Sequence, residues 1–235
     1  QVFTTVDYDV PENVELLTML GTANINSTGT DARDIIIGNA GENIIIGAGG
    51  ADVMRGGGGN DTYAVDESSD AVIEAVGEGF DNVYSSVDYI ISETSEIESA
   101  LLTGNAVILR GSSSDNQLIG NDQVNVIDGR GGTDYMIGGG GNDIFQITPD
   151  AGAVDVIGDF NNGAPGEGDR IAFAGFNAAT TVIVQVSDTS FEVRDNNGTA
   201  DTADDTVQQF ILNDAFGNQN YTGGDLVLNE DYYFS

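Results

Sequence analysis

The chain has 235 residues, of which 39 are acidic and 6 are basic, so its formal net charge is −33. This charge repels phosphates and argues against nucleic acid as a partner. The sequence contains no histidine and no cysteine, which excludes a Ser-His-Asp triad, a Cys-His pair, an HExxH zinc site, disulfides and thiolate metal sites.

Hydrophobic residues make up 40% of the sequence and recur at regular intervals. The chain can therefore bury a core, and we predict a folded protein rather than a disordered polyanion. No run of 18 apolar residues occurs, so no transmembrane segment is predicted. Two carboxylates about 5 Å apart repel by ~3 kcal/mol at an effective dielectric of about 20, so a folded form calls for cations.

Residues 1–28 are interpreted as lead-in strands of a truncated long repeat. The segment QVFTTVDY at Gln1 is similar to NVYSSVDY at Asn82, and GGGGND at Gly56 recurs at Gly138, 82 residues later. Asn82 directly follows a glycine-containing turn, so Gln1 stands where such a turn would end. We expect the chain to be the carboxy-terminal part of a longer array, and its first residues do not resemble a signal peptide.

A nine-residue period defines two blocks, residues 29–85 and 111–159, joined by a solenoid continuation over residues 86–110. The clearest units are GAGGADVMR, GGGGNDTYA, GRGGTDYMI and GGGGNDIFQ, which fit the pattern G-G-x-G-x-D-x-U-x with U a large apolar residue. The units begin at Gly29, Gly38, Gly47, Gly56, Gly111, Gly120, Gly129 and Gly138.

The sixth position of every unit is Asp or Asn, and the eighth is apolar, as at Ile36 and Met54. Polar turns thus alternate with short buried strands, and successive turns fall on opposite sides of the coil, so turns two units apart stack. We predict an all-β fold, a right-handed parallel β-roll. Asp70, Asp81 and Asp155 keep the Asp-x-apolar ending after the glycines thin out, which indicates that the coil continues there.

The turns have the composition of a calcium site. Glycine permits positive φ and close backbone approach, which lets several carbonyl oxygens point at one centre. The sixth-position carboxylate then completes the oxygen shell. Calcium takes about six to eight oxygens at about 2.3–2.6 Å, whereas magnesium demands strict octahedral geometry and zinc prefers nitrogen or sulfur. We therefore predict several bound calcium ions.

Stacking brings together sixth-position residues from turns two units apart. Pairs of carboxylates should bind calcium most tightly, since Asn keeps an oxygen but removes charge, and the pair Asp34/Asp52 ranks first. The predicted pairs are Asp34/Asp52, Asp52/Asp70, Asn43/Asp61, Asp61/Asp81, Asn116/Asp134 and Asn125/Asp143. All predicted metal ligands, turn glycines included, are Asp34, Asn43, Gly47, Gly49, Asp52, Gly56, Gly58, Asp61, Asp70, Gly79, Asp81, Asn116, Asn125, Gly129, Gly131, Asp134, Gly138, Gly140, Asp143, Asp155, Asp159, Asp169, Asp195, Asn197 and Asp201.

The last region, residues 160–235, is expected to be a β-rich C-terminal cap. Alternating apolar residues predict antiparallel strands in DVIGDF, GDRIAF, TTVIVQV, SFEVRD, QQFIL and DLVL. A solenoid needs its open end covered to hide unpaired strand edges. The string DNNGTADTADD at Asp195 has calcium-loop character through Asp195, Asn197, Asp201 and Asp205, although such strings also form plain turns.

The eight glycine-rich units resemble the RTX (repeats-in-toxin) family over roughly residues 29–159. The resemblance implies a parallel β-roll that binds calcium through turn carbonyls and the sixth-position Asp, a pattern from which Asn43, Asn116 and Asn125 depart. The long repeat resembles large bacterial surface and secreted RTX proteins. DVIGDF with GDRIAF is similar to the region after the roll in serralysin-type secreted proteins.

Such proteins leave a bacterial cell through type I secretion machinery that reads an uncleaved carboxy-terminal signal. DLVL at Asp225 and the terminal EDYYFS fit that signal loosely. The resemblance therefore implies a secreted, extracellular location, with attachment to the cell surface as a variant. A chain repelled by its own charge would stay unfolded in low cytosolic calcium and fold outside.

We predict an extracellular calcium-binding structural and export module that is not an enzyme. The alternative is a self-assembling calcium-dependent surface protein of S-layer or filament type, partnered by copies of itself in an oligomer or lattice. Tyr232, Tyr233 and Phe234 could then be an assembly tail, or else pack in the cap or act in export.

A non-catalytic module of a secreted hydrolase or polysaccharide-binding protein is a weaker alternative, because only six arginines are available for a basic groove. Carboxylate-pair glycosidase chemistry stays formally open, but calcium accounts for the acidic pairs.

Overall fold

The computed structural model describes residues 1–150, 152–161, 168–176, 181–187, 189–195, 206–212 and 232–234. Within these ranges the chain forms strands, turns and loops but no helix, as an all-β fold requires. No helix in this part of the chain is therefore long and apolar enough to span a membrane. The chain divides into two compact units, Gln1–Ala106 and Val107–Ser235, which are described separately.

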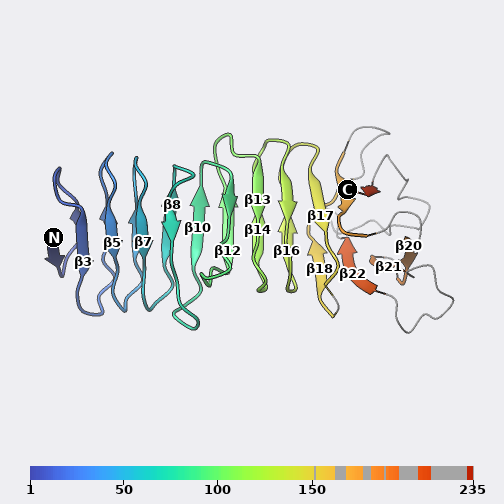
Figure 1. The fold of residues 1–235 in the computed structure, drawn as a ribbon, viewed down its shortest axis with the longest axis horizontal. Helices are drawn as coiled ribbons and strands as arrows, with labels where there is room; N and C mark the ends of the chain where they lie inside the picture. Colours follow the sequence, from blue (N-terminus) through green and yellow to red (C-terminus); the bar gives the residue numbers. More distant parts are fainter. Residues whose placement is uncertain are drawn as a thin grey trace. The chain divides into compact units, whose positions relative to one another are not determined.

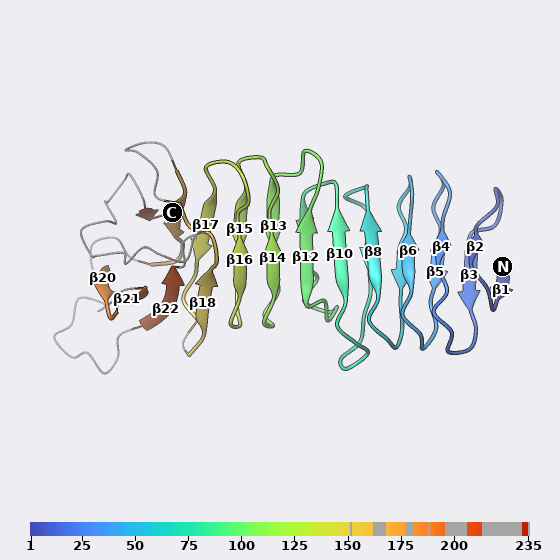
Figure 2. The same cartoon turned by 180° about the vertical axis from the view of Figure 1, so that it is seen from behind.

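In the first unit, successive strands alternate between parallel sheets, so the chain winds as a solenoid (Figures 1 and 2). One sheet has the order β1 (Val2–Thr4), β3 (Leu16–Met19), β5 (Ile35–Ile37), β7 (Val53–Arg55) and β9 (Ala71–Val72). The opposite sheet has the order β2 (Tyr8–Asp9), β4 (Ser27–Thr28), β6 (Ile44–Ile46), β8 (Thr62–Val65), β10 (Asn82–Ser85) and β12 (Ser99–Leu102), and β11 (Tyr89–Ile90) follows β10 in the chain.

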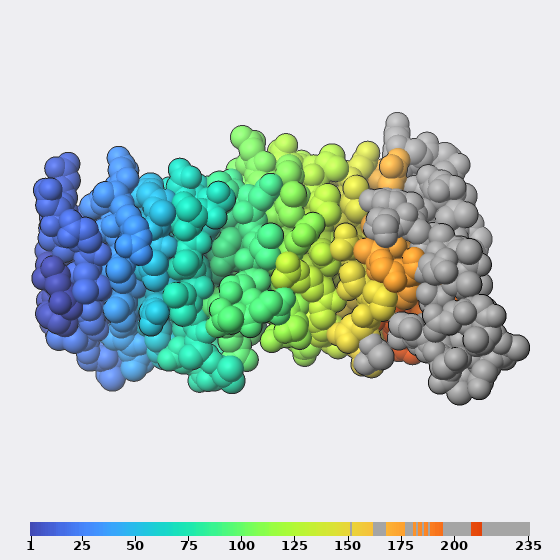
Figure 3. Space-filling view, viewed as in Figure 1, coloured from blue at the N-terminus to red at the C-terminus, as the bar shows by residue number. Residues whose placement is uncertain are grey.

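The strands are short because each nonapeptide supplies only three residues after its turn. In β5 the middle residue, Ile36, points inward and is fully buried, and parallel pairing places it beside Met54 of β7. Ile45 of β6 pairs in the same way with Tyr63 of β8. Each such apolar side chain contributes about 1.5–3 kcal/mol on burial. The predicted inward-facing eighth position is confirmed, and consecutive turns pack in contact along the unit (Figure 3).

The second unit repeats this construction. One sheet has the order β13 (Ile108–Arg110), β15 (Val126–Asp128), β17 (Ile144–Ile147), β19 (Arg170–Phe173) and β23 (Tyr232–Phe234). The other has the order β14 (Gln117–Ile119), β16 (Tyr135–Ile137), β18 (Val154–Ile157), β22 (Thr206–Leu212), β21 (Ser190–Asp195) and β20 (Thr181–Gln185). Leu118 pairs with Met136, and Ile127 with Phe145, so buried apolar columns form here as well.

Two segments expected among the antiparallel strands of the cap are instead parallel strands of the roll. GDRIAF forms β19, which pairs parallel with β17 through Phe145 and Ile171. DVIGDF forms β18, which pairs parallel with β16. The prediction of antiparallel strands was wrong for both segments, whereas the prediction that the coil continues at Asp155 is confirmed. Asp169 and Ile171 reproduce the same Asp-x-apolar ending after a longer connection, so β19 also fits the parallel stack.

The prediction of antiparallel strands is confirmed for β20, β21 and β22. β20 pairs antiparallel with β21, and β21 pairs antiparallel with β22, whereas β22 is parallel to β18. Phe210 of β22 stacks on Phe191 of β21 with ring centroids 5.3 Å apart, and its ring lies 5.8 Å from that of Phe173 in β19. These aromatic contacts join the antiparallel strands to the last turn of the roll. DLVL lies outside the described residues.

Candidate functional site

The sixth-position side chains form buried polar rows beside the apolar columns. Positions six and eight both face inward because side chains alternate along a strand with a period of two. Asp34, for example, is 1% exposed, and Ile36 beside it is fully buried. The other buried residues of these rows are Asn43, Asp52, Asp61, Asp81, Asn116, Asn125, Asp134, Asp143, Asp155 and Asp169.

In each predicted pair, a carboxylate oxygen of the later residue links two stacked turns. Oδ1 of Asp52 accepts a hydrogen bond from the main-chain N–H of Asp34, 18 residues earlier, at 2.7 Å. All six pairs expected from the sequence lie in contact in this way. The other five bonds run from Asn43 to Asp61, Asp52 to Asp70, Asp61 to Asp81, Asn116 to Asp134 and Asn125 to Asp143, at 2.7–3.0 Å.

Two further pairs were not predicted from the sequence. The N–H of Asp134 donates to Asp155 at 3.2 Å, and the N–H of Asp143 donates to Asp169 at 2.8 Å. Their separations are 21 and 26 residues, so a search at the regular spacing of 18 misses them. The Asp-x-apolar ending, present in both cases, is the signal that could have found them.

The second carboxylate oxygen is left without a partner at four of these positions. Oδ2 is buried and has no hydrogen-bond partner among the described residues in Asp52, Asp61, Asp134 and Asp143. An unsatisfied buried polar atom costs about 1–3 kcal/mol, and more when the group is charged. Four orphaned oxygens at equivalent positions of a repeat therefore indicate a ligand that the protein atoms do not supply.

The side chain of Asn43, in contrast, has hydrogen-bond partners for both of its polar atoms. Oδ1 of Asn43 accepts from the N–H of Asn39 at 2.9 Å, and its Nδ2 donates to the carbonyl of Ile25 at 2.7 Å. Asp34 also has a local partner, since its Oδ2 accepts from the N–H and Oγ of Thr30 at 2.7 and 2.9 Å. A cation at Asp34 would compete with Thr30 for this oxygen.

The first-position glycines leave room where oxygens from two turns meet. A Cβ at Gly111 would lie 2.5 Å from the carbonyl oxygen of Gly129 and 2.6 Å from Oδ1 of Asn116. At Gly29 a Cβ would crowd the carbonyl oxygen of Gly47 and lie 2.9 Å from Oδ2 of Asp34. At these two glycines the missing side chain leaves a space lined by a carbonyl of one turn and a sixth-position oxygen of its neighbour, whereas at Gly47 the nearest atoms belong to the side chain of Asp52.

Positive φ occurs at the second position of the turn, as at Gly57 and Gly139, and at the fourth, and neither position was among the predicted ligands. Gly50 and Gly141 have φ of 122° and 124°, a region that side chains rarely adopt. The third-position glycines were predicted as ligands, yet a Cβ at Gly49 or Gly58 would meet only ordinary contacts at 3.5 and 3.6 Å. Steric crowding does not explain glycine at these two positions, although a Cβ at Gly140 would lie 3.2 Å from Oδ1 of Asp122.

Burial raises the pKa of the paired carboxyl groups. Desolvation is the largest cause for Asp134, whose pKa rises to about 8, and nearby carboxylates such as Asp155 raise it further, while the N–H of Asn116 lowers it. The same cause raises the pKa of Asp143 to about 7. It raises the pKa to about 6 in Asp52, Asp61, Asp81, Asp155 and Asp169. A bound cation would favour the ionised form of each group.

The remaining predicted ligands differ in burial and in hydrogen-bond partners. Asp70 is half-buried, and its Oδ2 accepts from the N–H groups of Asp66 and Glu67. Asp159 accepts from the N–H groups of Gly138 and Gly139 at 2.9 and 2.8 Å. The backbone of Asp195 belongs to β21, but its side chain, together with Asn197 and Asp201, lies outside the described residues.

The donor set fits a hard divalent cation. It consists of carboxylate and carbonyl oxygens, with no nitrogen or sulfur ligand, and includes orphaned oxygens beside glycine-lined spaces. Calcium prefers such oxygen-rich sites. Comparison with known families gives the same answer, because the RTX calcium-binding nonapeptide repeat (4 copies) matches residues 28–63 and 110–145. The chain carries RTX calcium-binding repeats. No curated protein matches the chain.

The two RTX matches cover the glycine-rich cores of the two blocks expected from the sequence. Each match ends at an eighth-position aromatic residue, Tyr63 in the first and Phe145 in the second. These two segments are therefore calcium-binding repeats of a β-roll. Glu74, a buried carboxylate just beyond the first RTX segment, was missed by sequence reasoning because it does not stand at a sixth position.

Proposed function

We propose that calcium is the folding ligand of this module and is held between stacked turns of the RTX roll. The observation that carries the proposal is the set of orphaned Oδ2 atoms of Asp52, Asp61, Asp134 and Asp143. Each of these oxygens lies against a first-position glycine, at a distance too short for a side chain there. Two carboxylates of stacked turns and the adjoining turn carbonyls then act as the calcium ligands.

The large negative charge makes calcium binding decisive for folding. At a net charge of −33, the collapsed chain repels itself unless its buried carboxylates are neutralised. A site whose dissociation constant is a hundredfold below ambient calcium stabilises the fold by ~2.7 kcal/mol. Several such sites together decide between a folded roll and an expanded polyanion.

This calcium dependence suits a secreted bacterial protein exported by type I machinery. In low cytosolic calcium the polyanion remains unfolded and can thread a channel, whereas the higher calcium concentration outside the cell drives folding. The RTX repeats support an extracellular module. Because the chain contains no cysteine, calcium rather than disulfides would stabilise its fold. A structural role without catalysis follows, because the paired carboxylates serve as ion ligands.

Circular dichroism and small-angle scattering in chelator, and after adding calcium, test this function directly. We expect an expanded chain with little β structure in chelator and a compact β-rich form in calcium. Magnesium at equal concentration and sodium chloride at equal ionic strength are the controls for general charge screening. Full β content in excess chelator would falsify the proposal that calcium drives folding.

A row of exposed apolar residues favours calcium-dependent self-assembly as the second candidate. Ile46 of β6 and Tyr84 of β10 are 38% and 46% exposed, and both pair with Ala64 of β8, so the three lie in one outward-facing row. Such a row suits contact with another copy in a lattice or filament. Sedimentation with and without calcium distinguishes the candidates, because a monomer in calcium at high protein concentration contradicts self-assembly.

A further inference from the structure

Glu74 occupies a place in the stack that glycine holds elsewhere. Val72 of β9 pairs with Met54 of β7, and the N–H of Ile73 donates to the carbonyl of Met54 at 2.9 Å. The next residue, Glu74, therefore follows this register onto Gly56, the first position of a turn. The side chain turns inward, and Glu74 is 2% exposed.

This side chain replaces a main-chain acceptor. In the regular turns the N–H of the first glycine donates to a carbonyl of the stacked turn, as from Gly38 to Arg55 at 2.6 Å. The N–H of Gly56 donates instead to Oε1 of Glu74 at 2.8 Å, and the hydroxyl of Tyr63 donates to the same oxygen. Oε2 of Glu74 is buried and has no hydrogen-bond partner among the described residues.

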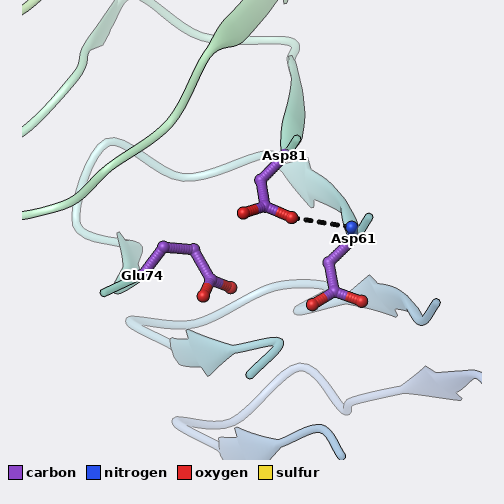
Figure 4. Close-up of side chains that lie close together, drawn as sticks. All are labelled: Asp61, Glu74 and Asp81. Carbon is purple, nitrogen blue, oxygen red and sulfur yellow. Dashed lines mark hydrogen bonds between the residues drawn. The ribbon is translucent and has the colours of Figure 1, made fainter. Parts of the chain in front are cut away.

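Glu74 faces two carboxylates of the regular stack, Asp61 and Asp81 (Figure 4). One oxygen from each residue lies within 4.8 Å of the others, and all three residues are buried. Asp81 accepts from the N–H of Asp61 at 2.7 Å, while Oδ2 of Asp61 is orphaned like Oε2 of Glu74. The cluster therefore holds two unpartnered carboxylate oxygens in a space shut off from solvent.

Among the residues that the structure describes, no cationic side chain forms an ion pair with Glu74, Asp61 or Asp81. The ion pairs found in the described part of the chain join Arg110 to Asp128 and Arg194 to Glu192, and neither involves the three carboxylates. Oxygens on opposite sides of a calcium ion can be about 4.6–5.2 Å apart, whereas magnesium limits this separation to about 4.0–4.2 Å. Oxygens spread over as much as 4.8 Å suit the larger ion.

We propose that Glu74, Asp61 and Asp81 form a three-carboxylate calcium site at the last regular glycine turn of the first block. Glu74 supplies a ligand that no nonapeptide provides, and Gly56 and Tyr63 hold its other oxygen in place. This inference rests on the proposed calcium-binding function and adds a ligand outside the repeat motif. It gives the first block one site with an additional carboxylate.

The test compares wild-type protein with Glu74→Gln, which keeps an acceptor for Gly56 and Tyr63 but removes the charge. Calcium stoichiometry is measured by native mass spectrometry and affinity by isothermal titration. We expect Glu74→Gln to bind one calcium ion fewer, or to bind one ion at least tenfold more weakly, and to fold in excess calcium. Glu12→Gln, an exposed residue with the same change in charge, is the matched control.

Terbium, a luminescent substitute for calcium, supplies a readout local to this site. Tyr63 contacts Glu74, so it should sensitise terbium bound there, and the chain has no tryptophan to mask the signal. We expect Tyr63→Phe to lower the emission with the calcium count unchanged, and Glu74→Gln to lower both. Glu74→Asp, which retains the charge, should recover the lost ion at higher calcium concentration.

The outcomes separate this inference from the function on which it rests. If wild-type and Glu74→Gln proteins bind the same number of ions with affinities within twofold, Glu74 is only a hydrogen-bonding residue and the inference fails, while the calcium function stands. If wild-type protein binds no calcium, the proposed function itself fails. A Glu74→Gln variant that does not fold in calcium is replaced by Glu74→Ala, which also removes the carboxylate and whose unchanged calcium count and affinity would equally overturn the inference.

Discussion

The main-chain N–H of Asp34 donates a 2.7 Å hydrogen bond to Oδ1 of Asp52, in the turn stacked upon it. The same carboxylate keeps Oδ2 buried and unpartnered. One side chain thus uses one oxygen to hold two turns together and offers the other to a ligand. Stacking and ion binding are coupled through this carboxylate, so a change that affects one oxygen alters both the stacking of the turns and the binding of the ion.

Substitution of Asp134 by Asn should weaken calcium binding and stabilise the calcium-free roll. The amide keeps an acceptor for the N–H of Asn116. It removes the carboxyl group, whose pKa is raised to about 8 by burial. We expect at least about tenfold weaker calcium affinity, equivalent to ~1.4 kcal/mol. Calorimetric titration measures the calcium affinity, and the residual β structure in chelator, followed by circular dichroism, measures the effect on the calcium-free roll. Asp122→Asn, at an exposed turn position, is the control, and equal effects at both positions would contradict the assignment.

Two glycines of one turn should differ sharply in their tolerance of alanine. A Cβ at Gly47 would lie 2.5 Å from Oδ2 of Asp52, whereas a Cβ at Gly49 would meet Cα of Asp31 at 3.5 Å. We expect Gly47→Ala to destabilise the calcium-bound roll by ~1–3 kcal/mol through crowding and to weaken calcium binding. Gly49→Ala should change neither by much. Denaturant unfolding in calcium checks both, and similar losses in the two variants would refute the steric role of Gly47.

The calcium-free roll should become less stable as pH rises. The pKa of Asp134 is raised from 3.8 to about 8 and that of Asp143 from 3.8 to about 7, so the folded state binds more protons than the unfolded chain between these values. Stability therefore falls across the window from about pH 4 to pH 8. We expect more β structure without calcium at pH 5 than at pH 8, measured by circular dichroism. Asp134→Asn should flatten this slope, and stability that rises with pH would count against buried, metal-free carboxyl groups.

Removal of the Phe210 ring should open the end of the roll in the second unit. Phe210 stacks on Phe191 and lies 5.8 Å from the Phe173 ring, and it is fully buried. We expect Phe210→Ala to destabilise this unit by ~3–5 kcal/mol. Hydrogen exchange should quicken at the amides of β18 and β19, which pack beside it. Val186→Ala, at a side chain 56% exposed, serves as the control, and unchanged exchange in β19 would deny β22 a capping role.

The repeat period made much of this fold predictable from the sequence. Glycine at the first position, Asp or Asn at the sixth and an apolar eighth residue determine which residues stack, so the contact of Asp52 with Asp34 followed from spacing alone. The pair Asp143 and Asp169 did not, since a longer connection changes the spacing to 26 residues while parallel pairing is kept. Constant spacing predicts contacts only where the connections have constant length, and the pair Asp61/Asp81, 20 residues apart, was predicted from the Asp-x-apolar ending instead.

Glu74 shows a different limit of prediction. The sequence shows where Glu74 stands, but a glutamate in a glycine-poor turn is usually predicted to be a solvent-exposed charge. Its inward orientation depends on the N–H of Gly56 and the hydroxyl of Tyr63, which reach it only once the turns have stacked. Similarly, local partners such as Thr30, which occupies an oxygen of Asp34, are set by turn geometry rather than by repeat identity.

Hydrogen bonds between residues 18 positions apart divide the sixth-position residues of the roll into two rows. Asp34 and Asp52 lie in one row because they are separated by two nonapeptides, while Asn43 between them belongs to the opposite row and bonds to Asp61. Loss of two consecutive nonapeptides would shorten the roll and leave every later carboxylate in its own row. Loss of one would exchange the rows, so that Asn and Asp would meet in new combinations. Evolution of such a chain by duplication is therefore expected to proceed in paired units.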